Sequence, residues 1–306
     1  MKVLITGSSG FIGSHLTEEF KAHEYEVICC GFHEKKNAII MDIMNPENIL
    51  HVISEYKPDV IVNMAGQADV GLAWKKPQYT MQLNTIGSIN ILEAVKNVNK
   101  KIKVIVIGSS DEYGALKDRG VNVTEEMHIT PITPYAISKY AQELFAQIYN
   151  KSYDMNICMI RLFNLGGARQ AKGFIISDFS SGIAEIEAGK REYLSVGNLN
   201  SSRDFTHVKD ACRAIRFIVE KGHSGDIYNI CSGHTHKVQE VLDKLISMAK
   251  TEIKVKQDPA RMRPSDSPII CGNHDKLTAH TGWQPKYEID KILTDALEYW
   301  RMKQSI

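Results

Sequence analysis

The chain has 306 residues, of which 43% are hydrophobic and 24% charged, an ordinary globular composition that can bury a sizeable core. Its 37 Lys and Arg balance 36 Asp and Glu, so we expect neither nucleic acid nor an anionic membrane as a partner. The N-terminal residues show no signal-peptide pattern, and no apolar segment is long enough to cross a bilayer. The six cysteines are scattered and form no CxxC pair. We therefore expect a cytoplasmic protein with free thiols.

Short apolar runs alternate with segments of helical spacing in the first half of the chain. The apolar runs, which suit strands buried on both faces, cover residues 3–6, 27–30, 60–65, 104–107 and 157–163. The segments with helical spacing cover residues 12–22, 45–56, 70–98 and 134–149. This alternation predicts an α/β fold with a doubly wound parallel sheet of the Rossmann type.

The second half of the chain is less regular. Helices are predicted over residues 178–188, 209–220, 238–250 and 289–302, a strand over 226–230, and a Pro- and Arg-rich loop over 259–268. We divide the chain into a dinucleotide-binding Rossmann domain, residues 1–164, and a smaller C-terminal α/β domain, residues 165–306. The second domain is expected to bind mainly substrate, with some segments returning to the first sheet.

A glycine-rich turn follows the first predicted strand and opens a helix, in the sequence Gly7-Ser-Ser-Gly10-Phe11-Ile12-Gly13. Gly7 permits the tight turn, Gly10 lets the backbone approach a pyrophosphate, and Gly13 allows close packing of helix on strand. The free N–H groups at the helix start, among them those of Phe11 and Ile12, are predicted to bind the phosphates.

The second apolar run ends without the acidic residue that would bind the adenosine ribose of NAD. His33, Lys35 and Lys36 follow instead, and cations suit the extra phosphate of NADP. We therefore expect NADP(H) or NAD(H), with NADP(H) preferred. Asp42 is predicted either to contact the adenine edge or to cap a helix.

Tyr135 and Lys139 carry the predicted chemistry, because residues four apart share one helix face. The ammonium is expected to lower the pKa of the phenol, which exchanges a proton with a substrate oxygen while a nicotinamide exchanges hydride. The same Tyr-x-x-x-Lys pattern begins at Tyr113 and Tyr287. Only Tyr135 follows a Thr-Pro pair typical of a helix start.

Polar residues also follow the predicted strand over residues 104–107. At the carboxyl end of a central strand such residues face the cofactor crevice. Ser109 is the candidate hydroxyl that orients the substrate oxygen, and Ser110 is the second candidate. The alternative is an ordinary turn, where serines are common.

In order and spacing these motifs resemble the extended short-chain dehydrogenase/reductases that act on nucleotide sugars. Further matching motifs are Asn63-Met-Ala-Gly-Gln67, Asn84-Thr-Ile-Gly87, Arg161-Leu-Phe-Asn164, Arg203-Asp-Phe-Thr206 and Thr281-Gly-Trp-Gln-Pro285. The stretches around residues 173–179, 196–199, 202–205 and 261–266 are similar to the GDP-sugar branch. Within it, the sequence resembles GDP-6-deoxy-4-keto-D-mannose reductases first and GDP-mannose 4,6-dehydratases second.

The resemblance implies reduction by NAD(P)H of the C4 ketone of GDP-4-keto-6-deoxy-D-mannose to GDP-D-rhamnose. It implies that Asn164 contacts this GDP-sugar near its diphosphate, that Arg203 and Arg263 neutralise the diphosphate, and that Ser110 also binds substrate. It further implies a homodimer that pairs the helices over residues 70–98 and 135–149. The candidate cofactor-binding residues are Gly7, Gly10, Phe11, Ile12, Gly13, Asp42, Ile43, Ala65, Gly66, Tyr135, Lys139 and Leu162.

Rival functions differ from the reductase in what they need. The resembling dehydratases place a Glu base two residues after the hydroxyl residue, where this chain has the shorter Asp111, although Glu112 follows and could serve. A 4-epimerase and a non-enzymatic redox sensor are further rival functions, but a sensor needs no catalytic serine, tyrosine and lysine. His234 and His236 lie in a polar stretch without helical ligand spacing, so we predict no metal site.

Overall fold

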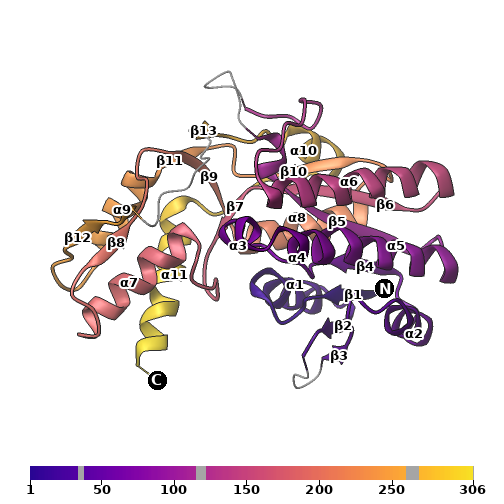
Figure 1. Ribbon diagram of the computed structural model, residues 1–306, viewed down its shortest axis with the longest axis horizontal. Coiled ribbons are helices and arrows are strands. Elements are labelled where there is room, and N and C mark those ends of the chain that lie inside the picture. The colour runs from indigo at the N-terminus through magenta and orange to yellow at the C-terminus, as the bar shows by residue number, and fades with distance from the viewer. Residues whose placement is uncertain (34–37, 115–121, 260–268, 306) are drawn as a thin grey trace.

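The computed structural model describes residues 1–33, 38–114, 122–259 and 269–305. A large parallel sheet with helices on both faces stands beside a smaller α/β unit (Figure 1). The predicted doubly wound Rossmann fold is confirmed. In the described part of the chain, no helix is long and apolar enough to cross a membrane.

The large sheet has seven parallel strands in the order β10-β6-β5-β4-β1-β2-β3. Their bounds are β1 (Lys2–Thr6), β2 (Glu26–Gly31), β3 (Ile39–Ile40), β4 (Val60–Asn63), β5 (Lys103–Ser109), β6 (Ile157–Leu162) and β10 (Ile227–Ile230). The chain winds outward in opposite directions from β1 and β4. In such a sheet the carboxyl edge at this switch point is where a ligand crevice forms.

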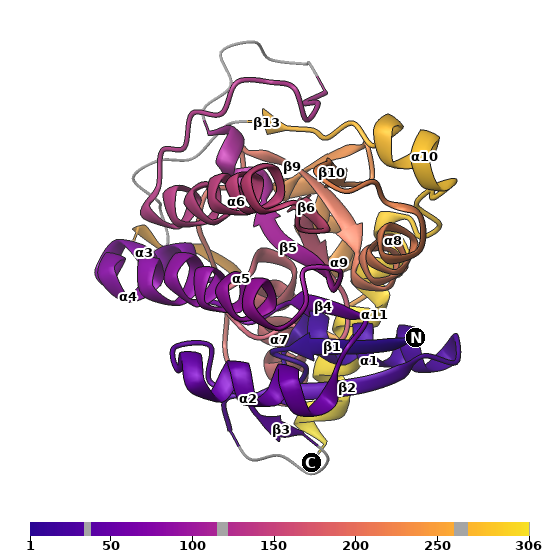
Figure 2. The ribbon, with the colours of Figure 1, turned by 90° about the vertical axis from the view of Figure 1, so that its right-hand side faces the viewer.

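Helices cover both faces of the sheet (Figure 2). One layer holds α1 (Phe11–Ala22), α8 (Val208–Lys221) and α10 (Asp275–Thr281), and the other holds α2 (Pro46–Tyr56), α5 (Gly87–Val98) and α6 (Pro134–Tyr153). Val3 and Ile5 pack under the first layer, whereas Leu4 packs under the second. Because alternate residues of β1 face opposite cores, these buried residues form an apolar run without alternation.

The long helix predicted over residues 70–98 is wrong. The structure divides it into α3 (Val70–Lys75), α4 (Pro77–Met81), the π-helix η1 (Gln82–Ile86) and α5. Pro77 explains the break between α3 and α4, because a proline disfavours the helical conformation of the residue before it. The π-helix η1 joins α4 to α5 with right-handed helical residues on both sides. Lys76 accordingly has φ −137° and ψ 65°, and α4 starts again with the proline in its first turn.

The smaller unit packs α7 (Ile175–Glu187), α9 (Val238–Ser247) and α11 (Ile289–Gln304) around a third core. Its strands are β7 (Asn164–Gly166), β8 (Leu194–Val196), β9 (Ser202–His207), β11 (Thr235–Lys237), β12 (Val255–Gln257) and β13 (Ile269–Ile270). The polar stretch around His236 is therefore not a loop: β11 pairs antiparallel with β9. From the second half of the chain, β10 joins the large sheet and α8 covers it.

Candidate active site

Two loops and a helix meet at the carboxyl edge of the large sheet. A Cβ at Gly7 would lie 3.1 Å from the Ala65 backbone, so the loops that follow β1 and β4 are in contact. A Cβ at Gly66 would lie 3.9 Å from Nζ of Lys139. The structure thus brings the glycine-rich turn, the Ala65–Gly66 backbone and α6 together at the switch point.

The glycine-rich turn has the shape that a dinucleotide requires. Gly7 has φ +61°, in the left-handed region that favours glycine, and a Cβ at Gly13 would lie 2.3 Å from the Gly7 carbonyl oxygen. Helix α1 starts after Gly10 without a side-chain cap or an acidic residue in its first turn among the residues described. The N–H groups at Phe11 and Ile12 are therefore open to an anionic ligand such as a pyrophosphate.

The segment predicted to hold the adenosine is only partly described. Phe32 and His33 are exposed after β2, while Lys35 and Lys36 lie outside the described residues. Asp42 accepts the N–H of Met44 at 2.9 Å and does not cap α2, because the cap is Asn45, which accepts the N–H of Asn48 at 3.0 Å. The alternative interpretation of Asp42 as an N-cap is therefore wrong. Ile43 is buried, and a Cβ at Gly87 would lie 2.6 Å from its side chain.

Helix α6 presents the predicted tyrosine and lysine on its first two turns. Thr133 accepts the N–H of Ala136 at 3.0 Å and Pro134 follows, which confirms the predicted helix start. Tyr135 and Lys139 are each 8% exposed, and Nζ of Lys139 donates to the Ile107 carbonyl at 2.8 Å. The lysine is thereby tied to the end of β5.

The tyrosines of the other two Tyr-x-x-x-Lys copies lie in different settings. Tyr113 is fully buried and donates from its hydroxyl to Asn229 at 2.8 Å, and Lys117 lies outside the described residues. Tyr287 precedes α11, so it does not share a helix with Lys291.

The acidity of the tyrosine differs from the prediction. Burial raises the pKa of Tyr135, the charge of Asp111 raises it further, and a hydrogen bond with Ser109 opposes the rise. The predicted lowering of the Tyr135 pKa is therefore wrong, because burial and neighbouring negative charge raise it, and the phenol is protonated at neutral pH. Burial also lowers the pKa of Lys139 to about 8, a shift that the charge of Glu112 opposes.

Ser109 is the last residue of β5 and the N-cap of a short 3₁₀ helix, η2 (Ser110–Tyr113). Its hydroxyl contacts Tyr135 and also accepts the N–H of Asp111 at 3.2 Å. Ser110 is buried in the first turn of η2. Of the two candidate serines, Ser109 is thus the one that the structure places against the phenol.

The predicted cofactor residue Leu162 and the predicted substrate residues Asn164 and Arg203 lie on strands β6, β7 and β9. Leu162 ends β6 opposite Ser109, and Asn164 begins β7 opposite Phe205 of β9. Arg203 lies two residues before Phe205 and donates to the Ser202 carbonyl at 2.9 Å. Arg263 lies outside the described residues.

Sequence reasoning missed the carboxylate that organises this strand. Asp204 is fully buried and accepts N–H bonds from Ser232, Gly233 and Gly272 at 2.8, 3.0 and 3.1 Å. It ties β9 to the loop after β10 and to the segment after β13. The available signal is the Arg203-Asp-Phe-Thr206 motif itself, in which an acidic residue stands directly before Phe205.

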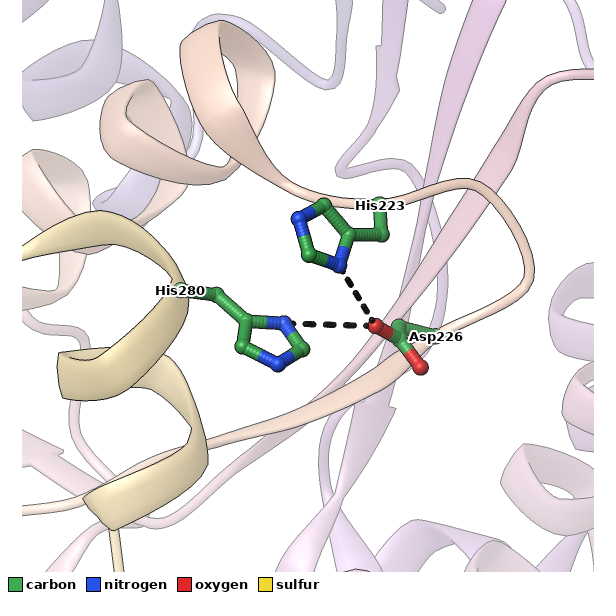
Figure 3. A group of neighbouring side chains, drawn as sticks. All are labelled: His223, Asp226 and His280. Atoms are coloured by element: carbon green, nitrogen blue, oxygen red, sulfur yellow. Dashed lines mark ion pairs between the residues drawn. The ribbon is translucent and has the colours of Figure 1, made fainter.

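One group of side chains in the described residues could hold a metal ion, and it lies elsewhere (Figure 3). Nδ1 of His223 and Nδ1 of His280 lie 3.5 and 3.3 Å from Oδ2 of Asp226. Lys276 lies 3.1 Å from the other carboxylate oxygen, and the Tyr228 hydroxyl contacts both Asp226 and His280. These contacts satisfy Asp226 without an ion. Asp226 precedes β10, so the group sits at the amino edge, opposite the candidate active site.

Comparison with known proteins decides the family. A sequence profile described as GDP-mannose 4,6 dehydratase matches residues 4–296. The chain belongs to this family. It is 31% identical over 304 residues to GDP-6-deoxy-D-mannose reductase of Pseudomonas aeruginosa, covering 99% of this chain and 98% of that one. It is 24% identical to GDP-mannose 4,6-dehydratase of Vibrio cholerae, covering 96% and 92%.

The solved structures agree with this family. RMD from Pseudomonas aeruginosa, in complex with NADPH, superimposes with a TM-score of 0.89 at 30% identity and covers 99% of both chains. The similarity therefore extends over the Rossmann sheet and the smaller unit alike.

Proposed function

We propose that the protein reduces the C4 ketone of GDP-4-keto-6-deoxy-D-mannose to GDP-D-rhamnose with NADPH. The observation that carries this proposal is the meeting of Ser109, Tyr135 and Lys139 beside the glycine-rich turn. The 31% identity with a GDP-6-deoxy-D-mannose reductase over nearly the whole chain supports the substrate.

The proposed chemistry divides the reduction between cofactor and protein. Bound NADPH supplies the hydride that reduces the carbonyl carbon. Ser109 hydrogen-bonds the C4 oxygen and orients it, and Tyr135 donates its phenolic proton to that oxygen as negative charge develops there. Lys139 stabilises the resulting tyrosinate and binds the nicotinamide ribose, and Tyr135 then regains a proton from water.

The groups around Ser109 favour a reductase over a dehydratase. Asp111 stands where a dehydratase base is expected, and its side chain is one methylene shorter than Glu. Glu112 is a poor substitute, because its carboxyl is fully buried and accepts the backbone N–H of Ser109 at 2.7 Å. A base must reach the proton that it removes. Neither carboxyl meets this requirement well.

We propose NADP(H) as the preferred cofactor, held by residues 7–13, Asp42, Ile43, Ala65, Gly66, Leu162 and the Tyr135–Lys139 pair. The uncapped start of α1 suits the pyrophosphate, and His33 is exposed where β2 ends. The NADPH complex of the Pseudomonas aeruginosa RMD supports the choice of cofactor.

We propose that residues 165–306 mainly bind the GDP-sugar, with Arg203 and Arg263 as contacts. Ser110 and Asn164 of the Rossmann domain are the proposed contacts from the other side. The pairing of β7 with β9 supports this division, because it places the strand of Arg203 beside the strand that follows β6. Arginine suits a diphosphate, since its planar fork of donors matches phosphate oxygens.

We propose a homodimer that buries an apolar stripe on α6. Ile137, Leu144, Phe145 and Ile148 share one face of this helix and are 39–53% exposed. Trp74, Tyr79 and Ile86, on the adjoining α3, α4 and η1, are exposed as well. Contiguous apolar surface of this kind marks an interface. We also propose a cytoplasmic location, which the six free cysteines support.

The function is tested by following NADPH absorbance with GDP-4-keto-6-deoxymannose and GDP-mannose offered separately. Stoichiometric NADPH oxidation with the keto sugar alone supports the reductase. Conversion of GDP-mannose to a keto sugar without net change in the cofactor would make the protein a dehydratase and refute the proposal.

A further inference from the structure

A buried carboxyl group lies directly behind the candidate catalytic residues. Glu112 is fully buried, and its Oε1 accepts the backbone N–H of Ser109 at 2.7 Å. A Cβ at Gly108 would lie 2.4 Å from this oxygen, so β5 leaves room for the carboxyl only because residue 108 is glycine. The Glu112 carboxyl thereby holds the backbone of Ser109 in place.

The second oxygen of Glu112 is buried without a hydrogen-bond partner among the described residues. It lies 3.6 Å from Nε of Arg161, which is too long for a hydrogen bond. Arg161 is already bonded to both carboxylate oxygens of Glu143, at 2.9 and 2.8 Å, and to the Tyr113 hydroxyl at 3.0 Å. One guanidinium thus stands between two buried carboxyls and forms hydrogen bonds with only one of them.

This arrangement favours a neutral Glu112. Burial raises its pKa well above the usual value and the charge of Glu143 raises it further, against the opposing effects of Arg161 and the Ser109 N–H. The other titratable groups facing it are Tyr135 and Lys139 on α6 and Asp111 and Tyr113 on η2. An ionised Glu112 would raise the pKa of both Tyr135 and Lys139. The neutral form leaves the phenol a better acid.

We propose that Glu112 is a positioning residue for the reduction, acting through Ser109. Its carboxyl holds the Ser109 amide and thereby sets the hydroxyl that contacts Tyr135 and the substrate oxygen. The inference rests on the proposed function, and it gives Glu112 a role other than that of a base.

Glu112→Met removes the acceptor while keeping a side chain of similar length. The Ser109 N–H then has no acceptor, and its desolvation penalty favours a displaced backbone at Ser109. We therefore expect kcat to fall about tenfold to a hundredfold. The Kd for NADPH should stay within about twofold, because the glycine-rich turn is untouched. Glu112→Gln keeps the acceptor and the shape of the neutral carboxyl. It should therefore retain kcat within about threefold, a rescue that a purely structural role does not predict.

Glu125→Met is the matched control. Glu125 is also a buried carboxyl that accepts a backbone N–H, from Asn229 at 2.7 Å, and its carbonyl accepts from Arg161 at 3.0 Å. This variant should lower thermal stability and leave kcat unchanged. Should Glu112→Met fail to fold, Glu112→Asp replaces it, because Asp retains a carboxyl but is one methylene too short to reach the Ser109 N–H in the same way.

Hydrogen–deuterium exchange over residues 104–114 gives a readout that needs no substrate. Exchange at Ser109 should be faster in Glu112→Met than in the wild type and unchanged in Glu112→Gln. Equal turnover in Glu112→Met and Glu125→Met, or an equal loss in Glu112→Met and Glu112→Gln, would overturn the proposal. A wild-type protein that reduces no keto sugar would instead refute the proposed function, while the exchange experiment would still test the Glu112–Ser109 contact.

Discussion

The ammonium of Lys139 donates a hydrogen bond to the carbonyl of Ile107, 2.8 Å away, so the cation of α6 is held at the end of the central strand β5. The same Nζ lies 3.9 Å from the position of a Cβ on Gly66. This fixed position is what the proposed double role of Lys139, toward the cofactor and toward Tyr135, requires. It also makes the charge of this lysine the first property to test.

Turnover should fall as pH rises through about 8, because burial lowers the pKa of Lys139 to that value. Below this pH the lysine keeps its charge, and above it the charged fraction falls about tenfold for each pH unit. The kcat/KM for keto-sugar reduction, which reports the pKa values of the free enzyme, should be measured from about pH 6 to about pH 10, with thermal stability followed over the same range. A flat profile across that range in a folded protein would contradict a role for the cation.

Tyr135→Phe should lower kcat about a hundredfold to ten-thousandfold, because general acid catalysis contributes that much. Binding of NADPH should survive, since the ring and helix are retained. Tyr140→Phe, on the same helix, is the control and should keep full activity. If Tyr135→Phe turns over like the wild type, another group donates the proton.

Gly13→Ala should weaken NADPH binding and lower the free energy of unfolding by about 1–3 kcal/mol, the usual cost of overpacking. The added methyl would lie 2.3 Å from the Gly7 carbonyl oxygen, so the turn or α1 must move. Gly31→Ala is the control for stability. Its Cβ would meet its nearest neighbours only at 3.9 Å, and an effect within about 0.5 kcal/mol is expected. Denaturant unfolding and fluorescence titration with NADPH give both quantities.

Ile148→Asp should convert the proposed dimer to a monomer, because it places a charge in the apolar stripe. Ile148 is 53% exposed in the single chain. Met302→Asp, at a site 61% exposed on α11, is the matched control and should leave the mass unchanged. Light scattering after size-exclusion chromatography measures the molar mass of both variants. A wild-type protein that is already monomeric would remove the stripe as evidence for a dimer.

The sequence predicted the parts of the fold that local pattern determines. A strand buried on both faces, such as β1, shows a short apolar run without alternation, which the sequence displays. Thr133 and Pro134 mark a helix start, and they distinguish the Tyr135 copy of the Tyr-x-x-x-Lys pattern from the other two. The break at Pro77 could have been foreseen from the proline itself. Strand β9 could not, because its polar residues reveal no alternation and its pairing is set by distant strands.

The ion pairs and pKa shifts of the candidate site could not be predicted from local sequence pattern. Glu112, Glu143 and Arg161 are far apart in the sequence and meet only because η2, α6 and β6 pack together. Burial then reverses the expected shift of the Tyr135 pKa. A sequence pattern gives the identity of charged residues, whereas their pKa values depend on the solvent that the fold excludes.

The most direct test of the central claim follows the transferred hydrogen. NADPH deuterated at the nicotinamide C4 position on the transferring face is incubated with GDP-4-keto-6-deoxymannose, and the product is analysed by mass spectrometry and NMR. We predict GDP-rhamnose carrying one deuterium at C4, formed in equal amount to the NADPH consumed. A product without deuterium at C4, or turnover of GDP-mannose with no net loss of NADPH, would contradict the assignment as a ketone reductase.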